Sequence, residues 1–208
     1  MRFKLFNSSR LLKASYFNIL LVSTKALSSV ITSKVIALFL GPSGLALLGN
    51  LKSLIKSVSS FTAEGYQNGT IRYISEHSKD EIQKNRISAT IFQLSLGFSI
   101  LIGVLIWLFS NILSLYLFRI EDYDYILKIV GLGLPFWSFN LLVIYILNGL
   151  ENYNRLVLVS TVLSVVNMLI SVLFIISHGL TGGLLATITG PVLVFMINLM
   201  ALGKERKL

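Results

Sequence analysis

The chain contains 208 residues, of which 54% are hydrophobic and only 13% are charged. This balance is far more apolar than that of a soluble domain, and several stretches offer the roughly 20 mainly apolar residues that a helix needs to cross a bilayer. The formal net charge of +9 does not indicate nucleic acid binding, because the basic residues flank hydrophobic stretches, where they orient a membrane protein. The apolar runs are continuous rather than alternating, which disfavours a β-barrel and predicts an all-α membrane protein.

The chain lacks cysteine and contains only two histidines. Disulfides, thiol nucleophiles and thiolate metal sites are therefore excluded. The tryptophans suit membrane interfaces or packing and indicate no cofactor site. We predict no metal, no cofactor and no catalytic residue.

The apolar runs predict six membrane spans that form a single bundle over residues 1–208. The second span is the weakest by hydropathy because it contains the charged stretch Asn50 to Gly69. The expected spans are Ala14 to Leu40, Leu45 to Tyr73, Ile87 to Leu108, Ile126 to Leu147, Leu156 to Ile176, and Leu184 to Leu202.

The distribution of basic residues predicts the orientation of this bundle. With six crossings, the uncharged turn 41–44 and the acidic segment 121–124 share one side of the membrane. By the positive-inside rule the other side, with both termini, is cytoplasmic. That side carries Arg2, Lys4, Arg10, Lys13, Arg72, Lys79, Lys84, Arg86, Arg155, Lys204, Arg206 and Lys207.

Four lysines lie inside the first two predicted spans. Lys25 and Lys56 each lie roughly 18 Å from the nearer span end at 1.5 Å per residue, close to the membrane midplane. A lone charge at that depth is costly, so such residues usually face a cavity or a partner. Lys34 and Lys52 lie nearer the outer boundary, where their stems could also reach the surface.

Glu64 is the one acidic residue inside the same two spans. It could form an ion pair with Lys25, or it could couple transport to protons or cations, and the sequence leaves both roles open. One glutamate cannot balance four lysines. The excess of positive charge predicts an anionic ligand in a hydrated cavity, lined by Lys25 and Lys56 and, less directly, by Lys52 and Lys34.

Small and polar residues in the spans are expected to serve helix packing. Gly65 and Gly69 are spaced for close helix approach, as are the glycines from Gly179 to Gly190. Pro135 and Pro191 are expected to kink their spans, since proline removes a backbone hydrogen bond. Asn140, Asn148 and Asn167 are expected to form hydrogen bonds with neighbouring helices.

Four blocks of sequence, in order along the chain, resemble one family of transporters. They are "LGPSGLALLGN" (Leu40 to Asn50), "GYQNGTIRY" (Gly65 to Tyr73), "NLLVIYILNGLENYN" (Asn140 to Asn154) and "GLTGGLLATITGP" (Gly179 to Pro191). These blocks are similar to bacterial Wzx-type O-antigen flippases, in the polysaccharide-transport branch of the multidrug/oligosaccharidyl-lipid/polysaccharide exporter superfamily.

This resemblance implies a multi-pass protein of the bacterial inner membrane that flips a polyprenyl-diphosphate-linked oligosaccharide to the outer leaflet. It also implies coupling to an ion gradient and a cationic central cavity between two six-helix bundles. A lysine-lined cavity suits a diphosphate, because each ammonium group supplies charge and hydrogen-bond donors.

The chain departs from the resembled family in its length. It supplies six predicted spans where the resemblance implies about twelve, so we expect it to correspond to the amino-terminal half of a twelve-helix, MATE-like transporter. We expect its partner to be either a second six-helix half or a second copy of the chain, because parallel association of two such bundles would reproduce the full arrangement.

Three alternative functions remain open from the sequence. A membrane enzyme acting on the same lipid would need clustered carboxylates or histidines, and the acidic group at 121–124 lacks a histidine companion. A drug or cation antiporter would favour an acidic cavity, opposite to the lysines found here. A noncatalytic subunit of a polysaccharide-assembly complex would lack flipping activity when purified.

Overall fold

The computed structural model describes residues 8–78, 80–119 and 121–205, and these residues contain helices and no strand. Among the basic residues used to predict orientation, Arg2, Lys4, Lys79, Arg206 and Lys207 lie outside the described residues. The elements are α1 (Ser8–Thr62), the 3-10 turn η1 (Glu64–Tyr66), α2 (Gln67–Glu76), α3 (Glu81–Leu108), α4 (Ser110–Phe118), the 3-10 turn η2 (Glu121–Tyr123), α5 (Asp124–Gly149) and α6 (Tyr153–Glu205).

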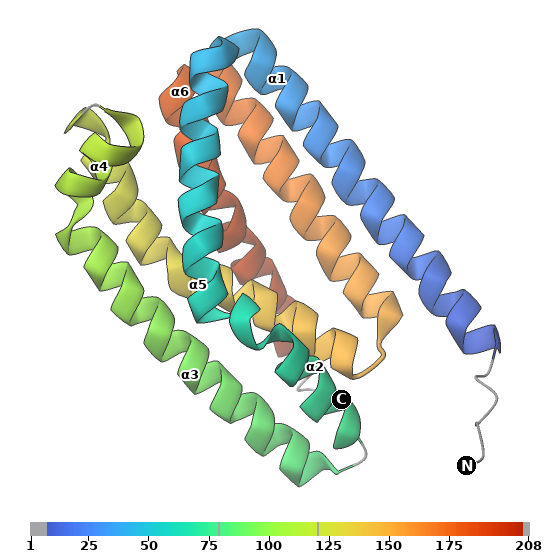
Figure 1. Cartoon of the computed structure of the whole chain (residues 1–208). Coiled ribbons are helices and arrows are strands. Elements are labelled where there is room, and N and C mark those ends of the chain that lie inside the picture. Colours follow the sequence, from blue (N-terminus) through green and yellow to red (C-terminus); the bar gives the residue numbers. More distant parts are fainter. Residues whose placement is uncertain (1–7, 79, 120, 206–208) are drawn as a thin grey trace.

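The two longest helices are each folded back on themselves at a glycine. Gly41 in α1 has φ 67° and ψ −169°, and Gly179 in α6 has φ 59° and ψ −133°. Side chains rarely tolerate such backbone angles, whereas glycine adopts them without steric cost. In Figure 1 each helix reverses direction at its bend, so that two antiparallel arms result.

Four helices in the described chain are long and apolar enough to cross a membrane: α1, α3, α5 and α6. These two stretches of α1 and α6, Tyr16–Thr62 and Tyr153–Met196, are 47 and 44 residues long, about twice what one crossing needs. Their bends fall between predicted spans one and two and between spans five and six. The all-helical prediction is confirmed for the described residues, while six crossings stay a prediction.

One end of the bundle gathers the connections that were predicted to carry positive charge. Figure 1 shows the start of α1, the α2–α3 and α5–α6 connections and the end of α6 at this end, opposite the bends of α1 and α6. Some of the basic side chains at this end form ion pairs with acidic side chains. Arg72 Nε lies 2.8 Å from Glu76 Oε1, and Lys84 Nζ lies 3.2 Å from Glu81 Oε1.

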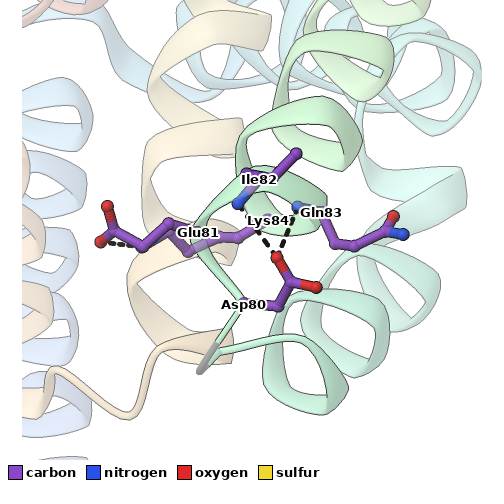
Figure 2. A network of polar contacts seen from close by, with 5 residues as sticks. All are labelled: Asp80, Glu81, Ile82, Gln83 and Lys84. Atoms are coloured by element: carbon purple, nitrogen blue, oxygen red, sulfur yellow. Dashed lines mark hydrogen bonds and ion pairs between the residues drawn. The ribbon is translucent and has the colours of Figure 1, made fainter.

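Helix α3 begins at a well-defined cap. Asp80 has extended backbone angles, and its Oδ1 accepts hydrogen bonds from the backbone N–H groups of Ile82 and Gln83, both at 3.1 Å. Figure 2 shows this carboxylate beneath the first turn of the helix, with the Glu81–Lys84 pair beside it. An aspartate at this position satisfies backbone donors that the first helical turn leaves free. The cap therefore fixes where the chain re-enters the bundle.

The third predicted span is extended by a second, short helix. Helix α3 ends before Phe109, and the chain continues as α4. The residue that follows α4, Arg119, has a left-handed backbone conformation. Asn50 Nδ2 donates a hydrogen bond of 2.9 Å to the backbone oxygen of Leu117 near the end of α4. This contact ties α4 to the second arm of α1.

The bundle is held together by apolar contacts and by close helix approach. α1 packs mainly on α6, and α3 packs mainly on α5. Where α3 crosses α5, a Cβ added to Gly103 would lie 2.4 Å from the backbone oxygen of Gly131, so the two backbones touch. Large apolar side chains also cover the outside, as expected of a surface that meets lipid. The main buried cluster comprises Ile36, Leu48, Leu51, Ile55, Ile106, Phe118, Ile126, Leu127, Val130, Leu134, Ile175, Leu184 and Ile188.

Asn140 confirms one prediction about polar residues in the spans. It is buried in α5, and its Nδ2 donates a hydrogen bond of 2.7 Å to the backbone oxygen of Pro191 in α6. A buried amide that meets a neighbouring helix in this way satisfies its own donor and supports the turn around a proline.

Candidate functional site

The charged stretch of the second predicted span contains a break in the helix. α1 ends at Thr62, and Ala63 adopts φ −145° and ψ −42° before the 3-10 turn Glu64–Tyr66 leads into α2. At Gly65 an added Cβ would lie 2.3 Å from the backbone oxygen of Ser60. Glycine therefore allows the chain to fold back tightly against its own preceding turn.

A break of this kind leaves carbonyl groups without their usual helical donors. The hydroxyl of Tyr66 reaches back to two of them, donating to the backbone oxygen of Phe61 at 3.2 Å and to that of Thr62. Ser95 Oγ in α3 donates to the same Thr62 oxygen at 2.6 Å. Unpaired carbonyls are costly in an apolar medium, so these hydroxyl groups stabilise the broken conformation.

Thr62 joins three helices at this point. Its side chain is fully buried, and its Oγ1 accepts a hydrogen bond of 2.9 Å from Ser138 Oγ in α5. Together with the bond from Ser95, this contact places α1, α3 and α5 around one small polar centre. We call Thr62, Tyr66, Ser95 and Ser138 the hydroxyl cluster.

Glu64 begins the turn beside the hydroxyl cluster. Its side chain is half-buried. Among the described residues, neither Glu64 nor Lys25 has an ion-pair partner within 4.0 Å, so the structure does not join these two residues. A coupling role for Glu64 stays a prediction.

All four predicted cavity lysines are exposed on the surface of the described bundle. Lys25 and Lys34 belong to the first arm of α1, and Lys52 and Lys56 belong to the second arm. Lys25 lies sixteen residues before Gly41 and Lys56 fifteen residues after it, so they lie at similar depths along the two arms. None of the four has an acidic partner within 4.0 Å in the part of the chain that the structure describes.

The helical repeat separates two of these lysines. Lys25 and Lys34 are nine residues apart, which is two and a half turns, or about 180° around the helix axis. They therefore point to opposite sides of the first arm. Lys52 and Lys56 are four residues apart and share a face of the second arm.

Sequence reasoning did not identify the hydroxyl cluster. The charged stretch Asn50 to Gly69 contains Thr62 and Tyr66, but the prediction gave no role to either residue. A usable signal was present in α3, where Ser95 and Ser99 lie four residues apart in an otherwise apolar run and are both buried. In the residues that the structure describes, no group of histidine, aspartate and glutamate is arranged to hold a metal ion.

The arrangement of the helices is that of a known class of membrane transporters. The structure is similar to the lipid II flippase MurJ in its inward closed conformation, with a TM-score of 0.74, 16% identity, and coverage of 97% of this chain and 45% of that chain. It is also similar to a MATE protein crystallised with MaD3S, with a TM-score of 0.71, 20% identity, and coverage of 90% of this chain and 44% of that chain. The fold is therefore that of MATE transporters and MurJ.

The sequence is similar to two particular proteins, the Lipid III flippases of Escherichia coli (strain K12) and Shigella flexneri. Each is 29% identical over 122 residues, which make up 59% of this chain and 29% of the flippase. The match thus spans less than a third of those relatives. A scan against known protein families finds no match. The MATE-like fold expected from the sequence is confirmed, and the similar proteins are flippases and transporters rather than enzymes.

Proposed function

We propose that this chain forms one bundle of a flippase that moves a polyprenyl-diphosphate-linked oligosaccharide across the bacterial cytoplasmic membrane. The similarity to Lipid III flippases carries this proposal. The name of those relatives describes the movement of a lipid-linked substrate, and the match covers 59% of this chain. Within that class we favour an O-antigen or related polysaccharide repeat unit, on the four sequence blocks that resemble Wzx-type proteins.

The lysines supply the chemistry that such a substrate requires. A diphosphate carries negative charge through the membrane, and ammonium groups that lack acidic partners are suited to bind it. We propose that Lys25 and Lys56, at similar depth on the two arms of α1, line the substrate path, with Lys52 on the same face as Lys56. Lys34 points away from Lys25, so it belongs to this path only if the path also passes the other side of the first arm.

The other wall of the cavity must come from outside the described bundle. The chain covers less than half of the solved transporters that share its fold. We propose that a second six-helix half, or a second copy of this chain, faces the exposed lysines. In this arrangement the six predicted spans cross the membrane and the end with the basic connections is cytoplasmic. Reading the source coding region beyond the codon of Leu208 distinguishes the two sources of the second half.

Transport by lysine variants tests this function. The chain, with its second half if the coding region continues, is reconstituted in liposomes that carry a fluorescent polyprenyl-diphosphate oligosaccharide, and flipping is followed by access of a quencher. Each lost contact between a charged group and phosphate costs about 1.5–3 kcal/mol, so Lys25→Ala and Lys56→Ala should each slow flipping about tenfold or more.

Lys84→Ala is the matched control for these variants. The substitution also removes an ammonium group, but Lys84 lies at the start of α3 and is paired with the exposed Glu81, so the flipping rate of this variant should stay near the parent rate. Equal flipping by Lys25→Ala, Lys56→Ala and the parent at equal abundance would remove the cavity assignment. A parent that inserts fully but flips nothing would contradict the proposed function itself.

We further propose that Glu64 couples flipping to an ion gradient. Glu64 is the first residue of the turn at the helix break, and its carboxylate lacks an ion-pair partner among the described residues. Glu64→Gln keeps the size and polarity of the side chain but cannot titrate. It should flatten the dependence of flipping on external pH while leaving membrane insertion intact, and an unchanged pH profile would refute the coupling role.

A further inference from the structure

A small, partly open pocket lies between the second arm of α1, α5 and α6, and none of the four lysines lines it. Its volume is about 10 Å³, enough for roughly one water molecule. Trp137 from α5 and Thr187 and Pro191 from α6 form part of its lining; the remaining wall is contributed by Ile55, Val130, Gly133, Leu134 and Ile188.

Trp137 brings an unsatisfied donor to this pocket. Its indole Nε1 is buried and has no hydrogen-bond partner among the described residues. Almost every buried polar group in a folded protein is paired, and each exception calls for a specific explanation such as a bound water. An indole N–H can only donate, so the missing partner must be an acceptor.

Thr187, also in the lining, provides a carbonyl that lacks its usual helical donor. Residue 191 is proline, which has no backbone N–H, so the helical hydrogen bond to the carbonyl of Thr187 cannot form. The hydroxyl of Thr187 does not replace the missing backbone donor, because it donates its proton to the backbone oxygen of Leu184 at 2.7 Å. The residue on α5 that carries the donor and the residue on α6 that carries the carbonyl thus line the same water-sized space.

We propose that this pocket binds a structural water molecule, which accepts a hydrogen bond from Trp137 Nε1 and donates one to the carbonyl oxygen of Thr187. A water can accept and donate at once, whereas a cation could not accept from the indole. An apolar cavity of this size would stay dry, but one with two unsatisfied polar groups is suited to hold water.

The water would complete the support of α6 around its proline. Asn140 in α5 already donates to the backbone oxygen of Pro191. With the water, two carbonyls near Pro191 would be linked to α5, one directly by Asn140 and one through the water. α5 would therefore support the turn of α6 in which proline removes a helical hydrogen bond.

Solid-state NMR of the full chain in lipid bilayers tests the site directly. The indole nitrogens are labelled with ¹⁵N, the lipids are deuterated, and magnetisation is transferred selectively from water protons. Trp107→Phe leaves Trp137 as the single labelled indole; Trp107 itself is 49% exposed on the outer surface. We expect transfer from water to the Trp137 N–H and an indole shift typical of a hydrogen-bonded group.

Two proline variants identify the acceptor. Pro191→Ala restores the backbone donor to Thr187 and should reduce the water signal at Trp137 severalfold. Pro135→Ala is the matched control, because the carbonyl that Pro135 leaves free belongs to Gly131, which faces Gly103 in α3, and the signal should persist.

Two results would overturn the proposal. The first is the absence of transfer from water to Trp137 in the spectrum of the parent protein. This result does not depend on whether any variant folds. The second is a water signal that Pro191→Ala leaves unchanged in a folded protein. Neither result depends on flipping activity, so the water site and the proposed function fail separately.

Discussion

α1 is interrupted twice, and its two interruptions are built in different ways. At Gly41 the chain reverses on a backbone conformation that only glycine adopts easily, and an added Cβ would meet no other group within 4 Å. At Ala63 the helix breaks in the interior, where hydroxyl groups from Tyr66, Ser95 and Ser138 surround Thr62. The first interruption needs one residue, and the second needs three helices.

The two interruptions therefore differ in what determines them: local sequence determines the first, and tertiary contacts contribute to the second. The reversal at Gly41 is followed directly by Pro42, which cannot donate a helical hydrogen bond, and α6 reverses in the same way at Gly179. The partners of Thr62 instead lie 33 and 76 residues away in the sequence. The conformation of the reversals is therefore encoded locally, whereas the break also receives hydrogen bonds from α3 and α5.

Gly65→Ala should have the largest effect on the break. The new Cβ would lie 2.3 Å from a backbone oxygen, which cannot move aside as a flexible side chain could. Overpacking against a fixed group costs about 1–3 kcal/mol, and we expect a loss near the upper end in the free energy of unfolding. Denaturant titration in detergent micelles measures this loss.

Gly69→Ala is the matched control, since it lies one helical turn further on and an added Cβ there would meet nothing within 4 Å. It should be neutral or slightly stabilising. Equal losses from both substitutions would mean that the break does not depend on close approach at Gly65.

Gly41→Ala should have the next largest effect, through the backbone alone. Its φ of 67° and ψ of −169° lie in a region that is essentially restricted to glycine, and other residues lose about 1–3 kcal/mol there. Gly49→Ala lies within the second arm, with open space around it, and should not destabilise the protein. If Gly41→Ala unfolded no more easily than Gly49→Ala, the reversal would not be fixed by local conformation.

The same contrast explains what could be predicted from the sequence. The reversals at Gly41 and Gly179 fall between predicted spans, because a glycine in a polar or uncharged turn interrupts an apolar run visibly. The pairing of Asn140 with a neighbouring helix was predicted because a lone amide in an apolar span must find a partner. These features depend on short sequence windows and on general costs of burial.

The helix break and the extra helix α4 were not predicted, for a common reason. Both depend on contacts between distant residues, such as the bond from Asn50 to the backbone of Leu117. The charged stretch Asn50 to Gly69 marked the second span as unusual, but the prediction assumed that its helix continued. The opposite directions of Lys25 and Lys34, by contrast, follow from their spacing alone and could have been derived from the sequence.

Thr62→Val tests the smallest step of the comparison, the contribution of one hydroxyl group to the break. Valine has nearly the same shape but cannot accept the hydrogen bond from Ser138, while the bond from Ser95 to the backbone oxygen remains available. Hydrogen bonds between membrane helices contribute about 0.6 kcal/mol on average and about 1.7 at most, so we expect a loss in this range. Thr62→Ser retains the acceptor and should recover most of that part of the stability. A double-mutant cycle with Ser138→Ala isolates the bond; if its coupling energy were zero, the break would be held by backbone contacts and packing rather than by the side chain of Thr62.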